Sequence, residues 1–336
     1  MPPIIPPRPV AVFGAAGHTG RFAVAELRRR GFPVVAVGRD PTKLGAPEVG
    51  IIVRAAQVDD PATLDAAFSE AVVVVNCAGP FLDTAAPVAA AALRAGAHYL
   101  DVTAEQASAT SSLQDLDGLA RRAGLLVLPA MGFYGGLADL LATAAVGDWG
   151  TVDTIRIGIA LDSWRPTLGT RITGQRNTVP RVVVSGGDLA PLSHPPGRTR
   201  WDFAPPFGSL EVGETPLSEV ILIHHHLRSA EVRTFLNDAP LRDLRDPDTP
   251  PPVPADPSGR SDQRFLVEVV AEKGGRTRRA AARGRDIYAS TAPLVAEAVA
   301  RIMRGEVRNA GAHAPGSVFE PRDFLGALAP DLEFLA

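Results

Sequence analysis

A glycine-rich segment near the start of the chain constrains its fold more than any other feature. Residues 10–31, VAVFGAAGHTGRFAVAELRRRG, place Gly14, Gly17 and Gly20 between a β-branched run and an amphipathic run. In a strand–loop–helix unit of this spacing, the glycines permit a tight turn, close approach of a pyrophosphate, and close helix–strand packing. The free N–H groups of the helix would bind the diphosphate. The pattern predicts the first unit of a dinucleotide-binding fold, and a glycine-rich turn without a ligand is the alternative.

The rest of the first 147 residues repeats this alternation of short apolar runs and helical patterns. Strands covered on both faces have continuous apolar, β-branched sequences, and alternating strand–helix units produce a doubly wound parallel sheet. We therefore predict a Rossmann domain of α/β class over residues 1–147. The predicted strands are 9–13, 33–37, 51–53, 71–75, 98–102 and 125–128, and the predicted helices are 19–30, 61–68, 84–95 and 105–123.

The pattern changes after residue 150, where longer segments alternate apolar and polar side chains. Such alternation is typical of antiparallel strands, and Gly274-Gly275 between two runs indicates a hairpin. We predict a second, α+β domain over 148–285 with a largely antiparallel sheet, and expect 286–336 to pack back on the first domain. The predicted strands are 154–162, 180–186, 219–227, 230–236 and 264–272, with a helix at 288–304. Segments 188–209 and 246–258 are predicted to be irregular, the second as a disordered loop or a mobile lid.

Charge and composition narrow the class of protein. The formal net charge is −3 and Cys77 is the one cysteine, so there is no electrostatic basis for binding nucleic acid and no internal disulfide. Residues 1–9 lack the apolar core of a secretory signal, and no apolar run approaches the roughly 20 residues of a membrane span. We expect a cytoplasmic protein with a small-molecule substrate and neither nucleic-acid nor membrane partners.

The end of the second predicted strand distinguishes NAD from NADP. An NAD site places Asp or Glu there, about 20 residues after the glycine motif, to bind the ribose 2′-OH. This chain has Arg39, followed by Lys43. Because a guanidinium binds a phosphate through paired hydrogen bonds, the sequence favours NADP(H). Two alternatives stay open: Asp40 facing the ribose, and a surface role for Arg39.

Hydride transfer also needs a proton donor within hydrogen-bond distance of the atom that gains charge. Tyr134 is the first candidate because it follows a predicted strand at the ligand edge, between two glycines. Packing of Tyr134 under the domain hinge is the alternative. Tyr99 and Asp101 are further catalytic candidates, although Asp101 at this position is also suited to capping the next helix. Candidate substrate contacts are Thr103, Glu105, Arg171 and Arg176.

Two other features invite a functional interpretation that the sequence does not favour. No activating histidine lies near Cys77 in the sequence, so an inert buried cysteine is favoured over a nucleophile. His224 and His226 would face the same side of a strand, but no acidic or cysteine ligand lies at metal-binding spacing. We therefore predict no metal site and interpret these histidines as packing or substrate-facing groups.

Several motifs in order resemble the saccharopine dehydrogenase-like oxidoreductases, the family of saccharopine reductases and trans-acting enoyl reductases. They are GAAGHTG (14–20), GRDPTKL (38–44), NCAGPF (76–81), HYLDVTAE (98–105), LPAMGFYGGLADLLA (128–142), GRDIYASTAPLVAEAV (284–299) and HAPGSVFEPRDFLGAL (313–328). The resemblance covers 9–147 and 284–328 well and the region between only faintly. It implies a Rossmann domain that binds NADP(H), a second domain that forms a homodimer, and hydride transfer in the cleft between the domains.

Position by position, the resemblance also implies a set of cofactor contacts. For the adenosine and phosphates these are Gly14, Ala15, Ala16, Gly17, His18, Thr19, Gly20, Arg39, Lys43 and Asp59; for the nicotinamide half they are Cys77, Ala78, Gly79, Pro80 and Phe81. The segment Gly132-Phe133-Tyr134 departs from the family's Gly-Phe-Asp, although Asp139 is kept, and this argues against saccharopine as the substrate. We expect a reductase or dehydrogenase of an imine, a carbonyl or an activated C=C bond, with a non-catalytic NADP(H) sensor as the alternative.

Overall fold

A seven-stranded parallel sheet forms the N-terminal part of the computed structural model, which describes residues 8–44, 50–307 and 309–335. The strand order is β15-β6-β5-β4-β1-β2-β3. This doubly wound order confirms the Rossmann prediction. The strands are β1 (Val10–Phe13), β2 (Val34–Gly38), β3 (Ile51–Ala55), β4 (Val73–Asn76), β5 (His98–Asp101), β6 (Leu126–Leu128) and β15 (Gly311–Ala312). Most of residues 1–9, on which the prediction of no secretory signal rests, lie outside the described range.

Helices cover both faces of this sheet because successive residues of its strands point to opposite sides. Val10 and Val12 pack in the cluster that includes α1 (His18–Arg29) and α10 (Thr291–Met303). Ala11 and Phe13 pack in the cluster on the other face. The helices of that face are α2 (Pro61–Phe68), α3 (Phe81–Arg94), α4 (Gln106–Asp115) and α5 (Asp117–Ala123). Helices α4 and α5 occupy the range 105–123, for which the sequence predicted a single helix.

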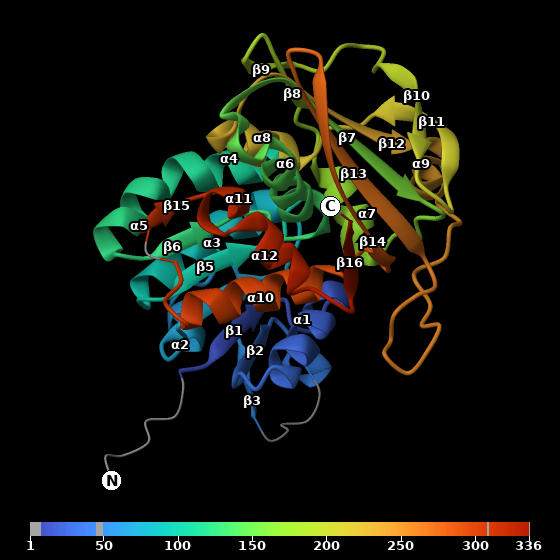
Figure 1. Cartoon of the computed structure of the whole chain (residues 1–336). Coiled ribbons are helices and arrows are strands. Elements are labelled where there is room, and N and C mark those ends of the chain that lie inside the picture. The colour runs from blue at the N-terminus through green and yellow to red at the C-terminus, as the bar shows by residue number, and fades with distance from the viewer. Residues whose placement is uncertain (1–7, 45–49, 308, 336) are drawn as a thin grey trace.

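A second, nine-stranded sheet follows and is largely antiparallel, as predicted (Figure 1). Its main path runs β10-β11-β12-β7-β13-β14-β16, with β8 and β9 attached through β12. The β12–β7 pair is parallel, so the sheet is mixed. The predicted hairpin joins β13 and β14. The strands are β7 (Thr151–Leu161), β8 (Val182–Ser185), β9 (Asp188–Pro191), β10 (Arg198–Phe203), β11 (Gly208–Glu214), β12 (Arg228–Asn237), β13 (Arg264–Lys273), β14 (Arg276–Arg285) and β16 (Leu332–Leu335).

Two predictions for this region were wrong, and two helices were missed. The strand expected at 219–227 is a helix, α8 (Ser218–His226), because its continuous run of apolar residues is buried on all sides and carries no strand periodicity. The irregular segment 188–209 contains β9 and β10; in β10 the alternating Trp201 and Phe203 are buried. Helices α7 (Leu168–Arg176) and α9 (Asp238–Arg245) were not predicted, and α7 buries none of its residues.

The segment 246–258 is an irregular loop with defined contacts. The Arg171 guanidinium donates to the carbonyl oxygens of Asp246 and Thr249, at 3.1 and 2.8 Å. Asp256 pairs with Arg285 on β14. These contacts attach the loop to α7 and to the second sheet.

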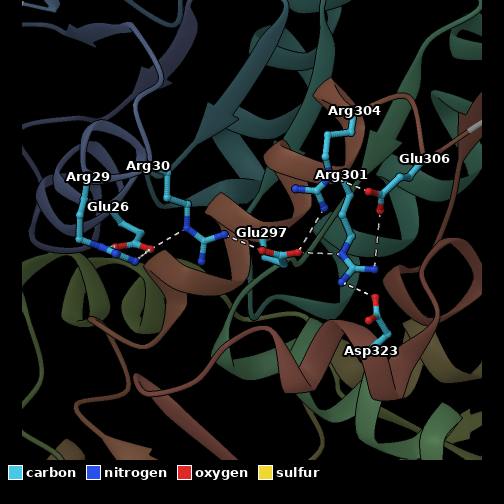
Figure 2. Close-up of polar contacts among 8 residues, drawn as sticks. All are labelled: Glu26, Arg29, Arg30, Glu297, Arg301, Arg304, Glu306 and Asp323. Atoms are coloured by element: carbon cyan, nitrogen blue, oxygen red, sulfur yellow. Dashed lines mark hydrogen bonds and ion pairs between the residues drawn. The ribbon is translucent and has the colours of Figure 1, made fainter.

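The C-terminal segment contacts both sheets. Helix α10 packs along α1, and β15 extends the parallel sheet. Helices α11 (Pro315–Val318) and α12 (Pro321–Gly326) pack on α6 (Ala138–Val146), whereas β16 pairs with β14 of the second sheet. An ion-pair network centred on Glu297 joins α1 to α10 and, through Arg301 and Asp323, to α12 (Figure 2).

Among the described residues, none of the helices has the length and apolar character needed to cross a membrane.

Candidate functional site: an interdomain dinucleotide cleft

The carboxyl ends of β1 and β4 lie side by side at the point where the strand order reverses. Phe13 is in register with Asn76, and the chain continues from β1 into α1 and from β4 into α3. The two loops touch: a Cβ on Gly14 would lie 2.9 Å from the Cβ of Ala78, and Gly14 has a φ of +80°. Ligands of open α/β sheets bind in the crevice at such a switch point.

The N-terminus of α1 is open for an anion. Gly17 occupies the N-cap without a side-chain hydrogen bond, and the first turn carries no acidic residue. A Cβ on Gly20 would lie 2.2 Å from the carbonyl oxygen of Gly14, so only glycine permits this close packing. Backbone N–H groups and the positive end of the helix dipole therefore fit a diphosphate, as the sequence predicts.

Arg39 lies just beyond the end of β2, at the same edge of the sheet. Its side chain is exposed and makes no hydrogen bond or ion pair with any residue the structure describes. Asp40 instead closes a local turn, because its carboxylate accepts hydrogen bonds from the Thr42 amide and hydroxyl and lies 3.8 Å from Lys43. This arrangement leaves the Arg39 guanidinium available and engages Asp40. Asp59, exposed after β3, also lies at this edge.

The loop of Cys77–Phe81 enters α3 under the second domain. The Glu105 carboxylate accepts hydrogen bonds from the amides of Phe81 and Leu82, at 2.8 and 3.2 Å, and so caps α3. A Cβ on Gly79 would lie 2.7 Å from Thr173 Oγ1, so α7 lies directly on this loop. Burial, together with nearby Asp101, raises the pKa of the Cys77 thiol to about 12. The thiol is thus protonated and a poor nucleophile.

Tyr99 and Asp101 belong to a buried network beneath the loop. The Asp101 carboxylate accepts from the amides of Thr103 and Ala130 and from the Tyr99 hydroxyl, at 3.0, 2.8 and 3.0 Å. Burial raises the pKa of Asp101 to about 6, although these hydrogen bonds oppose the rise. Tyr99 and Asp101 are both fully buried. The geometry favours a role in holding neighbouring loops, and their catalytic assignment stays a prediction.

Tyr134 differs from Tyr99 and Asp101 in the hydrogen bonding of its hydroxyl. It lies in η2 (Phe133–Leu137), a turn interrupted by non-helical backbone at Tyr134 and Gly135. Its Oη is buried without a hydrogen-bond partner among the described residues. Burial, with a smaller contribution from Tyr288 and Glu219, raises the pKa of Tyr134 well above its usual value. The phenol therefore carries its proton at neutral pH.

An aromatic cluster that the sequence analysis did not identify joins Tyr134 to the glycine loop. The Tyr134 ring stacks on Trp164 at 5.2 Å, and Trp164 Nε1 donates to the Tyr288 hydroxyl at 3.0 Å. The Tyr288 ring meets His18, the first residue of α1, at 5.3 Å. His18 Nε2 is buried and lacks a partner within the described chain, and burial lowers the pKa of His18. Tyr288 lies in a motif (284–299) that resembles the family, but no local pattern in that motif indicates a contact with His18 or Trp164.

The predicted substrate contacts have structural partners. Arg171 binds the loop at 246–258, and Arg176 pairs with Asp83 of α3 at 2.9 Å. Thr103 Oγ1 accepts from the Glu105 amide at 3.0 Å, and Glu105 caps α3. These contacts attach α7 and the β5–α4 loop to the cofactor edge. Whether any of the four residues also touches a substrate stays a prediction.

The histidine run lies on α8 and therefore does not have the strand geometry predicted for it. His226 Nε2 lies 2.7 Å from the carboxylate of fully buried Asp139, which also accepts from the Gly316 amide at 2.7 Å. Within the described residues, no group of three or more His, Cys, Asp and Glu side chains is arranged to hold a metal ion. The His226–Asp139 pair instead joins α8, α6 and α11.

A cavity of about 290 Å³ opens between α4 and the second domain. Ala104 and Gln106, which flank Glu105 in the sequence, form one wall. Asn177, next to Arg176, and residues 179–182 of the second domain form the other. Glu105 and Arg176, the sequence neighbours of these wall residues, both contact α3, which begins at the end of the predicted nicotinamide loop.

Comparison with known proteins agrees with this geometry. Residues 10–128 match the family model described as the saccharopine dehydrogenase NADP binding domain. The saccharopine dehydrogenase-like oxidoreductase of Homo sapiens is 31% identical over 154 residues, which cover 39% of this chain and 35% of the relative. An Arabidopsis thaliana protein described as a probable mitochondrial saccharopine dehydrogenase-like oxidoreductase is 27% identical over 154 residues, covering 40% and 34%. The matches therefore span about a third of these relatives' length.

The likeness of fold extends over nearly the whole chain. The apo saccharopine dehydrogenase (L-Glu forming) of Saccharomyces cerevisiae superposes with a TM-score of 0.68 at 13% identity, covering 98% of this chain and 100% of that chain. The shared fold thus includes the second domain as well. Residues 10–128 are thus similar to the saccharopine dehydrogenase NADP binding domain, and the chain shares part of its sequence with saccharopine dehydrogenase-like oxidoreductases.

Proposed function

We propose that this protein is an NADP(H)-dependent oxidoreductase that transfers a hydride to or from an imine, a carbonyl or an activated C=C bond of a small molecule. The observation that carries the proposal is the cavity between α4 and the second domain, whose wall residues Ala104 and Asn177 are sequence neighbours of two residues that contact α3. A cofactor bound across the switch point would present its reactive carbon to a substrate held there.

The residues at the sheet edge fit NADP(H). Amides of the first turn of α1 would bind the diphosphate, and Arg39 with Lys43 would bind the 2′-phosphate. The Cys77–Phe81 loop would support the nicotinamide ribose. Bound NADPH supplies a hydride to the electrophilic carbon of the substrate.

Tyr134 is the proposed proton donor. Its hydroxyl is protonated, buried and without a partner among the residues that the structure describes, whereas Asp101 and Asn76 both bind the hydroxyl of Tyr99. When the substrate carbon gains the hydride, the adjacent nitrogen, oxygen or carbon gains a proton, and Tyr134 would deliver it. Stacking on Trp164 would fix the ring while this happens.

A non-catalytic NADP(H) sensor is the second candidate, favoured by the engagement of Asp101 and Tyr99 in structural hydrogen bonds. NADPH oxidation, followed by its near-ultraviolet absorbance, with a panel of cyclic and acyclic imines, 2-oxo acids and enoyl thioesters separates the two. The oxidoreductase proposal expects substrate-dependent oxidation with at least one class. Tight NADPH binding with no oxidation by any compound would support the sensor.

A homodimer formed through the second domain and a cytoplasmic location complete the proposal. The resemblance noted in the sequence is the basis for the dimer, and sedimentation velocity tests it. Fractionation of the source cells tests the location, and it separates a cytoplasmic protein from a mitochondrial one, as the Arabidopsis relative is described.

A further inference from the structure

The walls of the interdomain cavity are mostly apolar. They include Val179, Pro180, Leu189, Leu217 and Ile221. A larger, open hollow of about 670 Å³ on the second sheet differs, because several of its charged side chains are paired with one another, as in Arg260–Asp331 and Arg283–Glu333. The interdomain cavity is at the small end of ligand pockets, which span about 300–1,000 Å³. Its walls suit a small molecule with an apolar body.

Arg181 is the one charged residue among those lining the cavity. It lies just before β8, is accessible to solvent, and makes no side-chain hydrogen bond or ion pair with the described part of the chain. Burial nevertheless lowers the pKa of Arg181, and the attraction of buried Glu219 only partly offsets this effect. Arg181 is therefore both accessible to solvent and close to many protein atoms, as expected for a side chain at the wall of a cavity. Its charge is available to a ligand.

The amide of Gln106 is fully used by the protein. Its Nε2 donates to the carbonyl oxygens of Val182 and Leu217 at 2.8 and 3.1 Å, and its Oε1 accepts from the Val182 amide at 2.8 Å. Gln106 therefore links α4 to the second domain, and its amide N–H groups are not available to bind a ligand. Discrimination by charge falls to Arg181 alone.

We propose that the substrate of the proposed oxidoreductase is a small molecule with an apolar body and a single carboxylate, which Arg181 binds. The inference rests on the proposed function and deepens it. A guanidinium forms paired, charge-assisted hydrogen bonds with a carboxylate, and removing such a contact weakens binding about tenfold to a hundredfold. Polar substrates with several charges would leave those charges unpaired against apolar walls, at a high desolvation cost.

Calorimetric titration of the NADP⁺-saturated protein tests the inference. The probes are hexanoate, its neutral analogue hexanamide, and L-glutamate as a multiply charged molecule. The variant is Arg181→Met, which keeps the aliphatic stem, and the control is Arg242→Met, an exposed arginine of α9 outside the cavity. Melting curves verify that both variants fold.

We expect hexanoate to bind the wild type at least tenfold more tightly than hexanamide or glutamate. Arg181→Met should lose this preference, whereas Arg242→Met should keep it. Equal binding of hexanoate and hexanamide by the wild type, tightest binding of glutamate, or an unchanged hexanoate affinity in Arg181→Met would overturn the inference. Failure of the protein to bind NADP⁺ would instead refute the proposed function, and the hexanoate titration of the free protein would still test the role of Arg181.

Discussion

At the scale of single residues, the buried hydroxyls of two tyrosines near the cofactor edge, Tyr99 and Tyr134, have opposite hydrogen-bonding states. Tyr99 donates to Asp101 and accepts from Asn76 at 3.2 Å, whereas the Tyr134 hydroxyl has no described partner. Burying a polar group without a hydrogen-bond partner lowers the stability of the fold, because no new hydrogen bond offsets the loss of its contacts with water. A spare hydroxyl at a ligand edge therefore indicates a function in binding or catalysis.

This difference predicts opposite results for two matched variants. Tyr99→Phe should lower the free energy of unfolding by about 1–3 kcal/mol, because it leaves Asp101 and Asn76 short of a partner. Tyr134→Phe should leave stability unchanged or raise it, while lowering kcat on an active substrate by about a hundredfold or more. Urea denaturation and steady-state kinetics measure both. A large loss of stability in Tyr134→Phe with unchanged kcat would assign this residue to packing.

At the scale of elements, α8 is anchored by its last residue. Burial opposes protonation of His226, but the adjacent Asp139 carboxylate outweighs it and raises the pKa of His226 above its usual 6.5. The folded state therefore binds this proton more tightly than the unfolded state. The stabilisation is complete below the unfolded pKa and is lost as the pH rises through the folded pKa.

The His226–Asp139 pair should accordingly make the stability of α8 depend on pH. His226→Gln should destabilise the protein more at about pH 5.5 than at about pH 8.5. Burial lowers the pKa of the neighbouring His225, so His225→Gln should show a dependence of the opposite sign. Denaturant unfolding at the two pH values measures the difference. An effect of His226→Gln that is the same at both values would rule out the ionic pair.

Elements also differ in how far the sequence predicts them. The glycine motif, β1 and α1 follow from local spacing, because each glycine meets a local steric demand, such as the contact of Gly20 with the Gly14 carbonyl. Helix α8 does not, because its buried run Val220–Ile223 has neither helical nor strand periodicity. Helix α7 exposes Leu168 and Ile172 and is defined by tertiary contacts, among them Arg176 with Asp83.

The same distinction applies to the site. The cofactor edge is built from consecutive residues of βα units, so motif spacing predicts it. The cluster of His18, Tyr288, Trp164 and Tyr134 joins residues far apart in the sequence. These residues come into contact only in the complete fold, where the second domain packs on the first. No local sequence pattern indicates such a contact.

At the scale of the whole molecule, α10 connects the Rossmann domain to the C-terminal helices. Glu297 is nearly buried and pairs with Arg30, the residue that follows α1, at 2.6 Å and with Arg301 at 2.9 Å. Arg301 is equally buried and reaches Asp323 of α12 at 2.7 Å. Removing one charge from such a buried network leaves its partners uncompensated.

Glu297→Gln should therefore lower the free energy of unfolding by roughly 3 kcal/mol. Glu306→Gln, which removes an exposed member of the same network, should have little effect because solvent screens its pairs. Guanidinium denaturation of both variants provides the comparison. Equal losses of unfolding free energy in the two variants would contradict the idea that burial determines how strongly each ion pair stabilises the protein.

The central claim, that the molecule is built to bind NADP(H), depends on Arg39 at the edge of the parallel sheet, whose guanidinium has no partner in the described part of the chain. Fluorescence titration of wild type and Arg39→Ala with NADPH and NADH tests it most directly. The wild type should bind NADPH about tenfold to a hundredfold more tightly than NADH, and Arg39→Ala should bind both with the affinity of NADH. Equal affinity of the wild type for the two nucleotides would contradict the account.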